Sequence, residues 1–509
     1  MDLLLPGLNE APARQNTVAS AKLAVINFCD LLVYPKTANA QQLPFKLALT
    51  IPDGWKHASA LAAMKEGGNT TGFAPCTLET LIDSPLVCGA HTKRVPIGPA
   101  GSNHAVFLAC DSEAGLAVPA DVKAGWDALV VQADKLFGSR PFGAYTFLLA
   151  LSDKIRFRGL EHHESSDNRL SENTLLTPHL RLYSAGLFPH EYVHAWCGKF
   201  RRPAGMIVPD FQAAPDTRLL WAYEGLTNYL GWVLTARSGL MSVEATRDDL
   251  AATAERMKNA RGRAWRPLED TGTSSSFLAG SRGAWGAWRR SLDYYDEGTL
   301  LWLEADAIIR KETAGRKTLD DFCRGFFACP PGRPAPKGYA LDDIVASLNA
   351  VCPYDWKAHL TRRVALPAAD APLEGIVLGG WSLGYADRPG ETQRASEAVS
   401  KGLDLTSSVG VKLTSEGVVS DVIPDGPGAK AKLAPGAKLV AVNGRRFTPE
   451  LLKTAVAATR TGGKLDLLVE NGDWFRTATV EYAGGLRYPA LERTAAEPDR
   501  IGAILAPRP

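Results

Sequence analysis

The sequence predicts a multidomain α+β protein, and three observations support this. The chain has 509 residues, more than a single hydrophobic core normally organises. Short apolar or alternating runs dominate both ends, whereas apolar residues at helical spacing dominate the middle. We therefore expect an N-terminal β domain over 1–115, a mostly helical region over 116–365, a connector over 366–400, a β-rich unit over 401–490 and a tail over 491–509.

The N-terminal domain is expected to consist of short strands. Runs at 21–35 and 45–52 are apolar or alternating, and each closes at a proline. Residues 92–96 and 104–110 have the same character. No residue of this domain indicates a chemical role.

Helical periodicity begins near residue 118. Residues 122–137 have it, and the apolar run 145–151 that follows predicts a buried strand. Further helices are expected at 243–260, 297–311, 341–350 and 356–363, interrupted by a loop at 270–290 that is rich in Gly, Ser and Trp.

The connector and the last unit differ in composition. Residues 366–400 are rich in Pro, Gly, Asp and Ala, which predicts loops with a little β structure. In the last unit, runs at 408–413, 417–424, 438–444 and 464–470 alternate like strands, and 448–459 predicts a helix.

The stretch from His190 to His194 carries the clearest chemistry. It reads His-Glu-x-x-His, and positions i and i+4 of a helix lie on one face. Two imidazoles placed there can share a zinc ion, with Glu191 beside the metal-bound water. Glu224, in a second apolar segment, offers a third ligand. Two His and one Glu leave a fourth position open for water, as a catalytic zinc requires.

The competing interpretation is a surface helix face without metal. The flanks of the motif and the segment around Glu224 are strongly apolar, which predicts burial. Burying two imidazoles and two carboxylates without a cation would be costly. The pattern therefore favours one zinc ion per chain. Pro189 fits only the first turn of a helix, so the motif is expected near a helix start or after a kink.

Composition excludes several classes of function. A net charge of +2 gives no indication of nucleic-acid binding, and no run approaches the ~20 apolar residues of a membrane helix. The eight cysteines form no Cys-x-x-Cys pair, so a zinc ribbon is not expected. Their number permits disulfides, such as Cys76–Cys88 or Cys323–Cys329, and free buried thiols fit equally well.

Several segments resemble known families. Ser408-Val-Gly-Val, with 424–436 and 439–444, resembles the peptide-carboxylate loop and following strands of a PDZ domain. The chain from about 25 to 495 resembles the glycyl aminopeptidase family of gluzincin zinc metallopeptidases, which end in such a domain. The most specific matches are Gly159-Leu-Glu-His162, residues 190–196, 220–229 and 294–298, and Gly484-Gly-Leu-Arg-Tyr-Pro489.

The resemblance implies a thermolysin-like catalytic region and a role for each motif. His190, His194 and Glu224 would bind zinc, and Glu191 would take a proton from the zinc-bound water during peptide hydrolysis. Tyr295 would donate a hydrogen bond to the developing oxyanion. Tyr294 competes for that role, and core packing is the alternative for either tyrosine.

The loop Gly159-Leu-Glu161-His162 resembles the exopeptidase loop of related aminopeptidases. Its carboxylate would bind the free α-ammonium of the substrate, which makes Glu161 and Gly159 substrate-binding candidates. The resemblance also implies a preference for small N-terminal residues, Gly or Ala, and a periplasmic or secreted location. Residues 1–10 lack the features of a signal peptide, so either the protein is cytoplasmic or the chain begins after its export signal.

Three positions leave their interpretation open. Cys197 stands where the family usually has Asn, and it either reaches the metal or fills the core. Asn228 either hydrogen-bonds a zinc-binding His or lies on a helix surface. His162-His163-Glu164 suggests a second metal site, although an exposed polar turn explains it better.

Two other functions compete with an aminopeptidase. One is a zinc endopeptidase to which the PDZ domain presents the C-termini of peptide or protein substrates. The other is an inactive PDZ-bearing binding protein. The complete set of predicted catalytic residues argues against the second.

Overall fold

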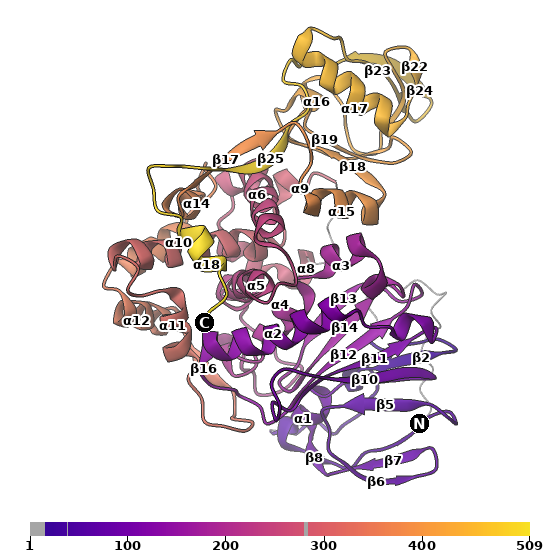
Figure 1. Ribbon diagram of the computed structural model, residues 1–509, viewed down its shortest axis with the longest axis vertical. Helices are drawn as coiled ribbons and strands as arrows, with labels where there is room; N and C mark the ends of the chain where they lie inside the picture. Colours follow the sequence, from indigo (N-terminus) through magenta and orange to yellow (C-terminus); the bar gives the residue numbers. More distant parts are fainter. Residues whose placement is uncertain (1–15, 38, 279–283) are drawn as a thin grey trace.

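The computed structural model describes residues 16–37, 39–278 and 284–509 and has the expected multidomain α+β architecture. Small β-sheets lie at the bottom of Figure 1, helices fill the middle, and a separate β unit lies at the top. The first ten residues, on which the export-signal expectation rests, and residues 279–283 lie outside the described residues. The expectation of a loop over 270–290 is wrong for the described part, which contains short helices at Leu268–Thr273, Ser275–Leu278 and Gly286–Arg289.

The N-terminal part consists of short strands, as expected, and its strands pair in antiparallel fashion. One sheet has the order β1 (Val18–Ala19), β2 (Leu23–Ile26), β9 (Leu86–Gly89) and β5 (Lys56–Ser59). Two smaller sheets and a short helix complete it: β4 (Ala48–Thr50) with β7 (Thr70–Phe73) and β6 (Ala63–Gly67), β3 (Pro44–Phe45) with β8 (Cys76–Thr77), and α1 (Leu78–Ile82).

A five-stranded sheet joins this part to the helices. Its order is β10 (His91–Ile97), β11 (His104–Cys110), β12 (Tyr145–Leu151), β14 (Ser165–Leu170) and β13 (Arg158–Glu161). The central strands are parallel, and α2 (Ala120–Phe137) crosses over between β11 and β12. β13 is an antiparallel edge strand, and it carries Gly159 and Glu161. Two strands that precede residue 115 thus belong to the sheet that supports the site.

The helical layer is built around two long helices, α5 (Leu220–Arg237) and α10 (Asp293–Glu312). The short helix α4 (Leu187–Val193) packs against α5, and Pro189 lies in its first turn, as expected. The other elements of this region are α3 (Pro178–Ser184), β15 (Arg201–Pro203), α6 (Val243–Asn259), α7 (Leu268–Thr273), α8 (Ser275–Leu278), α9 (Gly286–Arg289), α11 (Leu319–Phe326), β16 (Lys337–Tyr339), α12 (Leu341–Val351) and α13 (Trp356–Val364).

The helices α5 and α10 approach each other closely because glycines meet at their crossing. A Cβ built on Gly298 would come within 2.6 Å of the Gly225 Cα, a separation that no larger residue tolerates. Gly225 follows Glu224, and Gly298 lies one turn after Tyr295. The close crossing therefore brings Glu224 and Tyr295 towards the same space.

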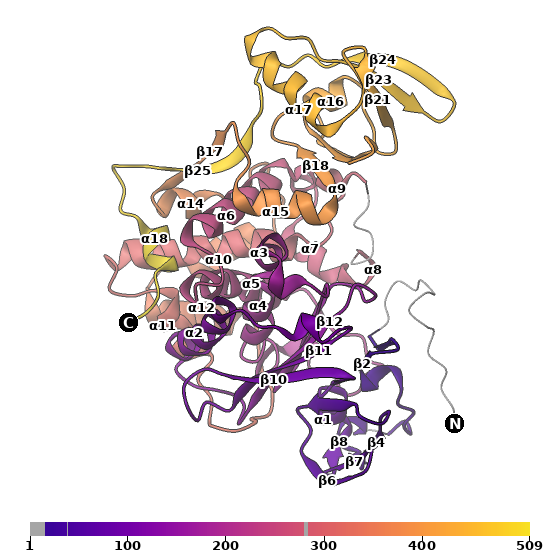
Figure 2. The same cartoon turned by 45° about the vertical axis from the view of Figure 1, so that its right-hand side comes forward.

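The connector contains more regular structure than the sequence indicates. It forms α14 (Glu374–Leu378), β17 (Trp381–Ala386) and α15 (Glu391–Ser400). Figure 2 shows α15 between the upper β unit and the helices below, where it packs against α3 and α6.

The upper β unit has its own core. Its strands are β18 (Gly402–Leu405), β19 (Val411–Thr414) and β20 (Val419–Val422) in one sheet, and β22 (Arg445–Arg446), β21 (Lys438–Val442), β23 (Asp466–Asn471) and β24 (Trp474–Thr479) in another. Its helices are α16 (Pro427–Lys430) and α17 (Pro449–Ala458).

The end of the chain returns to the helical layer. β25 (Tyr488–Arg493) pairs with β17, and α18 (Arg500–Leu505) buries Ile501, Ile504 and Leu505 in the large core that also contains α5 and α10. The residues from 491 onwards are therefore packed structure. The domain boundaries given in the sequence analysis stay predictions.

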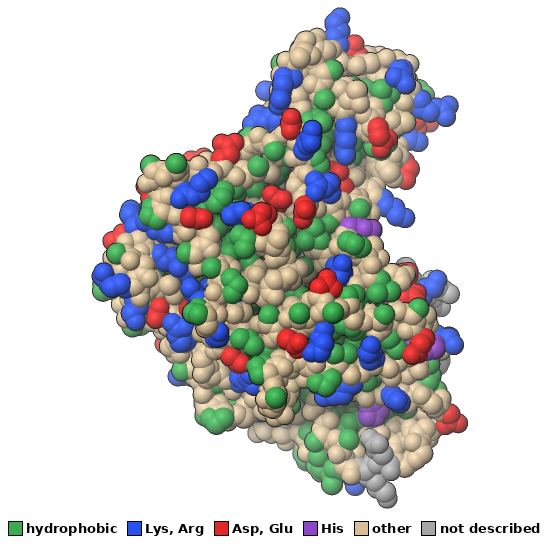
Figure 3. Space-filling model, viewed as in Figure 1, with side chains coloured by type: hydrophobic (Ala, Val, Ile, Leu, Met, Phe, Trp, Pro, Cys, Tyr) green, Lys and Arg blue, Asp and Glu red, His purple; other side chains and the backbone are tan. Residues whose placement is uncertain are grey.

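The surface and the cysteines agree with the composition. Figure 3 shows charges of both signs interspersed over the visible face, and a hollow at its right edge below the upper unit. Within the described ranges, no helix has both the length and the apolar character needed to cross a membrane. All eight cysteines are free thiols, so the disulfides Cys76–Cys88 and Cys323–Cys329 are absent.

Candidate metal centre and active site

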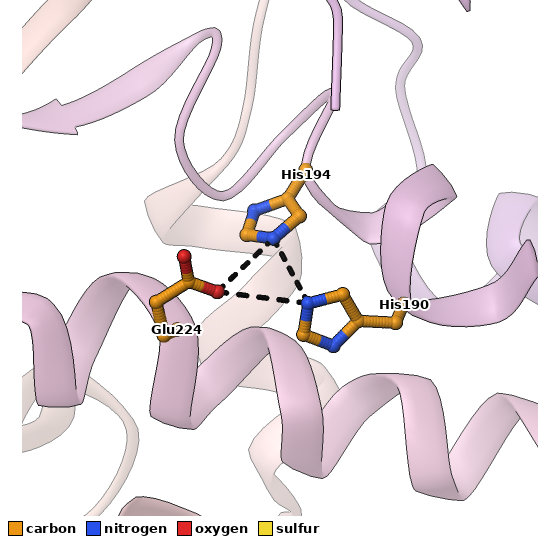
Figure 4. Close-up of side chains that lie close together, drawn as sticks. All are labelled: His190, His194 and Glu224. Atoms are coloured by element: carbon orange, nitrogen blue, oxygen red, sulfur yellow. Dashed lines mark hydrogen bonds and ion pairs between the residues drawn. The ribbon is translucent and has the colours of Figure 1, made fainter. Parts of the chain in front are cut away.

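Three predicted ligands from two helices converge at one point. His190 and the neighbouring His194 project from α4 and its C-terminal end, and Glu224 projects from α5 (Figure 4). The two Nε2 atoms are 3.1 Å apart, and Glu224 Oε2 lies 3.6 Å from His190 Nε2 and 3.2 Å from His194 Nε2.

The orientation of His194 suits a ligand. Its Nδ1 lies 2.9 Å from the carbonyl oxygen of Cys197, an acceptor, so Nδ1 carries the proton. Nε2 of the neutral ring is then unprotonated, and its lone pair, which can bind a metal, faces His190 and Glu224. A hydrogen bond of this kind fixes both the tautomer and the ring orientation of a metal-binding histidine.

The donor set fits a divalent metal. Glu224 Oε2 is buried, and it receives no hydrogen bond from the described residues. Burial would raise the pKa of the Glu224 carboxyl, but the two imidazoles lower it below its ordinary value. A buried carboxylate oxygen that faces two imidazole nitrogens is costly without a cation. Two nitrogens and one oxygen are a donor set that zinc accepts.

Glu191 is buried beside this set, and Gly159 leaves room for it. A Cβ on Gly159 would overlap the Glu191 carboxylate, so any larger residue there would displace that carboxylate from its position. Burial raises the pKa of Glu191 to about 8; His190 opposes the shift, and Glu161 and Glu224 add to it. A cation held nearby would lower the pKa again, towards the range of a general base at neutral pH.

Glu161 lies at the His194 side of the site and is held as an anion. Its Oε1 accepts a hydrogen bond of 2.6 Å from the Tyr223 hydroxyl. Donor atoms of Glu161, Glu191 and His194 all lie within 4.8 Å of one another. Burial alone would raise the pKa of Glu161, but His194 and Lys199 lower it below its ordinary value.

The two candidate tyrosines are placed differently. The Tyr295 ring lies 6.0 Å from the His190 ring, and Tyr295 is half-buried. Tyr294 is only 5% exposed, and its ring packs 4.8 Å from that of Tyr295 within the large core. Burial raises the pKa of Tyr295, so its hydroxyl stays a donor.

The contacts of Cys197 and Asn228 bear on the alternatives that the sequence left open for them. Cys197 is 1% exposed, its sulfur contacts the carbonyls of Ala222 and Tyr223, and burial raises the pKa of its thiol to about 12. It is therefore a core thiol. The Asn228 amide donates to Thr299 Oγ1 on α10 at 2.8 Å, so this hydrogen bond goes to a neighbouring helix and not to a zinc-binding His.

The expected exposed turn at 162–164 is wrong for its two histidines. His162 and His163 are 5% and 4% exposed. His163 Nε2 lies 2.7 Å from the Pro141 carbonyl, and its backbone N–H donates to Asp83. His162 faces Asp83, which also pairs with Lys199 at 3.0 Å. These contacts make the segment part of a buried polar cluster under Glu161.

Sequence reasoning missed Tyr223 and Lys199 as supports of Glu161. Tyr223 immediately precedes Glu224, and that adjacency was the available signal. Lys199 and Asp83 could not be linked to Glu161 without the fold, because Asp83 belongs to the N-terminal part of the chain.

Family models match three parts of the chain. The model described as M61 glycyl aminopeptidase matches residues 183–301, the M61 N-terminal domain matches 8–90, and the PDZ domain matches 398–470. The chain is a metallopeptidase with M61 and PDZ domains. The donor set and Glu191 lie within the matched M61 segment, whereas Gly159 and Glu161 precede it.

Two solved structures are similar to this M61 peptidase, the first of them in fold over nearly the whole chain. An aminopeptidase N family protein from Idiomarina loihiensis has 20% identity and a TM-score of 0.76, with 97% of this chain and 84% of that chain covered. An M1 zinc metallopeptidase from Deinococcus radiodurans has 17% identity and a TM-score of 0.44, with 71% and 74% covered. None of the curated proteins matches the chain in sequence.

Proposed function

We propose that this M61 peptidase is a zinc-dependent aminopeptidase that removes small N-terminal residues, Gly or Ala, from peptides. His190, His194 and Glu224 would hold one zinc ion. The observation that carries the proposal is the position of Glu161, a fixed anion beside the donor set. An anion there attracts a free terminal ammonium.

The residues around the donor set have separate roles in the proposed hydrolysis. When bound there, zinc supplies Lewis-acid polarisation of the peptide carbonyl and makes water more acidic. Glu191 accepts the proton of the attacking water and passes it to the leaving amine. The Tyr295 hydroxyl donates a hydrogen bond to the oxygen that gains charge.

Glu161 orients the substrate. Its hydrogen bond from Tyr223 and the field of Lys199 favour the ionised carboxylate, which can pair with the ammonium of the first residue. The preference for Gly or Ala follows from the M61 glycyl aminopeptidase likeness. The same likeness is the basis for proposing a periplasmic or secreted location.

One experiment separates the three candidate functions. The purified protein is assayed for metal content and for hydrolysis of Gly- and Ala-amides, and of the same amides with an acetylated amine. We expect about one zinc per chain, loss of activity on chelation, and hydrolysis of the free-amine substrates only. Preference for blocked peptides would favour an endopeptidase, and metal without turnover would favour a binding protein.

The upper β unit, which contains the PDZ match at 398–470 and is called the PDZ unit below, has contacts that support an aminopeptidase over an endopeptidase with PDZ-presented substrates. β19 follows the loop Ser408–Gly410, and it pairs with β18 on one edge and β20 on the other. Ser408 Oγ donates to the Arg487 carbonyl and accepts its N–H. A peptide that joined β19 as an added strand would have to displace β18.

A further inference from the structure

A cavity of about 360 Å³ opens beside His190. It lies between α3, α4, α5, α6 and α15, and its volume falls within the range of ligand pockets. Leu187, Trp232 and Leu250 contribute apolar surface, and polar side chains, among them Thr392 and Ser396 of α15, line the rest. Phe157 and Tyr183 also line the cavity; they are 49% and 48% exposed and stack edge to face.

The position of the cavity beside His190 relates it to the second residue of a bound peptide. Glu161 lies at the His194 side of the donor set, whereas the cavity is lined by His190. A peptide with its ammonium at Glu161 and its first carbonyl at the donor set continues past His190. The side chain of its second residue then faces the cavity.

Asp249 distinguishes this cavity chemically. It is the single carboxylate of the lining, and among the described residues it has no hydrogen-bond or ion-pair partner. The nearby Arg256 pairs with Asp296 instead, at 2.7 Å. Burial raises the pKa of the Asp249 carboxyl to about 6, and Arg256 compensates in part.

A carboxylate without a partner, in a cavity that also has apolar surface, matches a long basic side chain. The methylene groups of Lys or Arg can lie against the apolar residues while the cation reaches the carboxylate. A charge-assisted hydrogen bond in such surroundings is stronger than a neutral one. A neutral side chain of equal length would leave Asp249 unpaired.

We propose that this cavity binds the side chain of the second substrate residue and that Asp249 selects Lys or Arg there. The proposal rests on the proposed aminopeptidase function, because the direction of the substrate comes from Glu161.

The test compares substrates that differ only in the second residue. Hydrolysis of Ala-Lys-amide, Ala-norleucine-amide and Ala-Glu-amide is measured for the wild type and for Asp249→Asn. We expect the wild type to favour Lys, and Asp249→Asn to lower kcat/KM for Ala-Lys-amide by ~10- to 100-fold while hardly changing that for Ala-norleucine-amide. Alanine amide, which has no second residue, is expected to be cleaved equally by both.

Two control variants accompany the test. Asp248→Asn changes the preceding residue of α6, which lies outside the cavity and accepts a hydrogen bond from the Glu391 N–H. An amide oxygen can still accept that bond, so the Lys preference is expected to persist. Asp249→Glu keeps the charge and is expected to retain most of the preference.

The outcomes are distinct. Equal losses of Asp249→Asn on all substrates, alanine amide included, would make Asp249 structural and overturn the proposal, as would a wild type without Lys preference. If no amide is hydrolysed, the proposed function fails, and calorimetric binding of Ala-Lys-amide and Ala-norleucine-amide decides instead. Tighter binding of the Lys peptide that Asp249→Asn abolishes would support the cavity assignment, and equal affinities would overturn it.

Discussion

Each ionisable group at the centre of the site is held by a neighbour of a different kind. A backbone carbonyl orients His194, a tyrosine hydroxyl binds Glu161, and the absence of a side chain at Gly159 makes room for Glu191. Glu224 faces the two imidazoles. These supports assign separate roles to three carboxylates that share one small volume, and each role can be tested alone.

Replacing Glu191 with Gln tests the general base. The amide keeps the shape of the side chain but cannot accept the proton of the attacking water, so kcat should fall by ~10²-fold or more. Zinc content, measured by atomic absorption, should stay near the wild-type level because Glu191 is not in the proposed donor set. Nearly unchanged turnover in the zinc-loaded variant would remove Glu191 from the mechanism.

Tyr295→Phe tests the oxyanion donor against its neighbour. Removal of one hydroxyl donor should reduce kcat by ~10²- to 10³-fold with little change in KM. Tyr294→Phe is the matched control, since the Tyr294 ring packs in the core and its side chain is almost fully buried. If the loss appears in Tyr294→Phe alone, the roles of the two tyrosines are exchanged.

Glu161→Ala tests exopeptidase recognition. The lost pair with the ammonium should lower kcat/KM on Ala-amide strongly, by an amount equivalent to ~2–5 kcal/mol. Any residual hydrolysis of N-acetyl-Ala-amide should hardly change, because that substrate has no ammonium. Equal losses on both substrates would mean that Glu161 supports the fold of the site.

Among the elements, those with a strong local pattern could be predicted from the sequence. The run 145–151 forms β12 at the predicted residues, and Pro189 correctly indicated the helix start before the motif. The connector helices were missed because α15 is largely polar and α14 is short. The pairing of β17 with β25 joins segments about 100 residues apart, and no local pattern indicates such a contact.

The site shows the same division. The motif residues and Glu224 could be found from residue types and apolar flanks. Glu161 could be found only through the family likeness, because one glutamate on a short edge strand has no local signature. Its supports Tyr223 and Lys199, and the cavity with Asp249, depend on how β13, α5, α6 and α15 pack, which the sequence alone does not reveal.

The crossing of α5 and α10 makes a prediction at the element scale. Gly298→Ala would place a Cβ against the Gly225 backbone, which cannot yield cheaply, so the helices should separate at a cost of ~1–3 kcal/mol. Zinc affinity should also fall, because Glu224 lies beside the contact. Gly325→Ala on α11 is the control: its Cβ meets open space, so it should stabilise the helix by ~0.5–1 kcal/mol. Thermal unfolding and zinc titration measure both effects, and a Gly298→Ala variant as stable as the wild type would contradict the close crossing.

In the whole molecule, the large core is assembled from two separate stretches of the chain. It takes residues from β10 through α14 and then from α18, whereas the PDZ unit between these stretches forms a separate core. The two cores are therefore expected to unfold in separate transitions, because a multidomain chain need not unfold in a single two-state step.

Ile504 and Leu439 distinguish the two cores. Both are almost fully buried, but Ile504 belongs to the large core and Leu439 to the PDZ core. Truncation of a buried aliphatic side chain to Ala costs ~2–5 kcal/mol, so Ile504→Ala should lower the Tm of the catalytic transition, and Leu439→Ala that of the PDZ transition. Zinc binds only the folded catalytic region in this proposal, so added zinc should raise the first Tm and leave the second unchanged. Calorimetry with and without chelator identifies each transition. If Ile504→Ala instead shifted the zinc-independent transition, the last residues of the chain would stabilise the PDZ unit and not the core that holds the metal site.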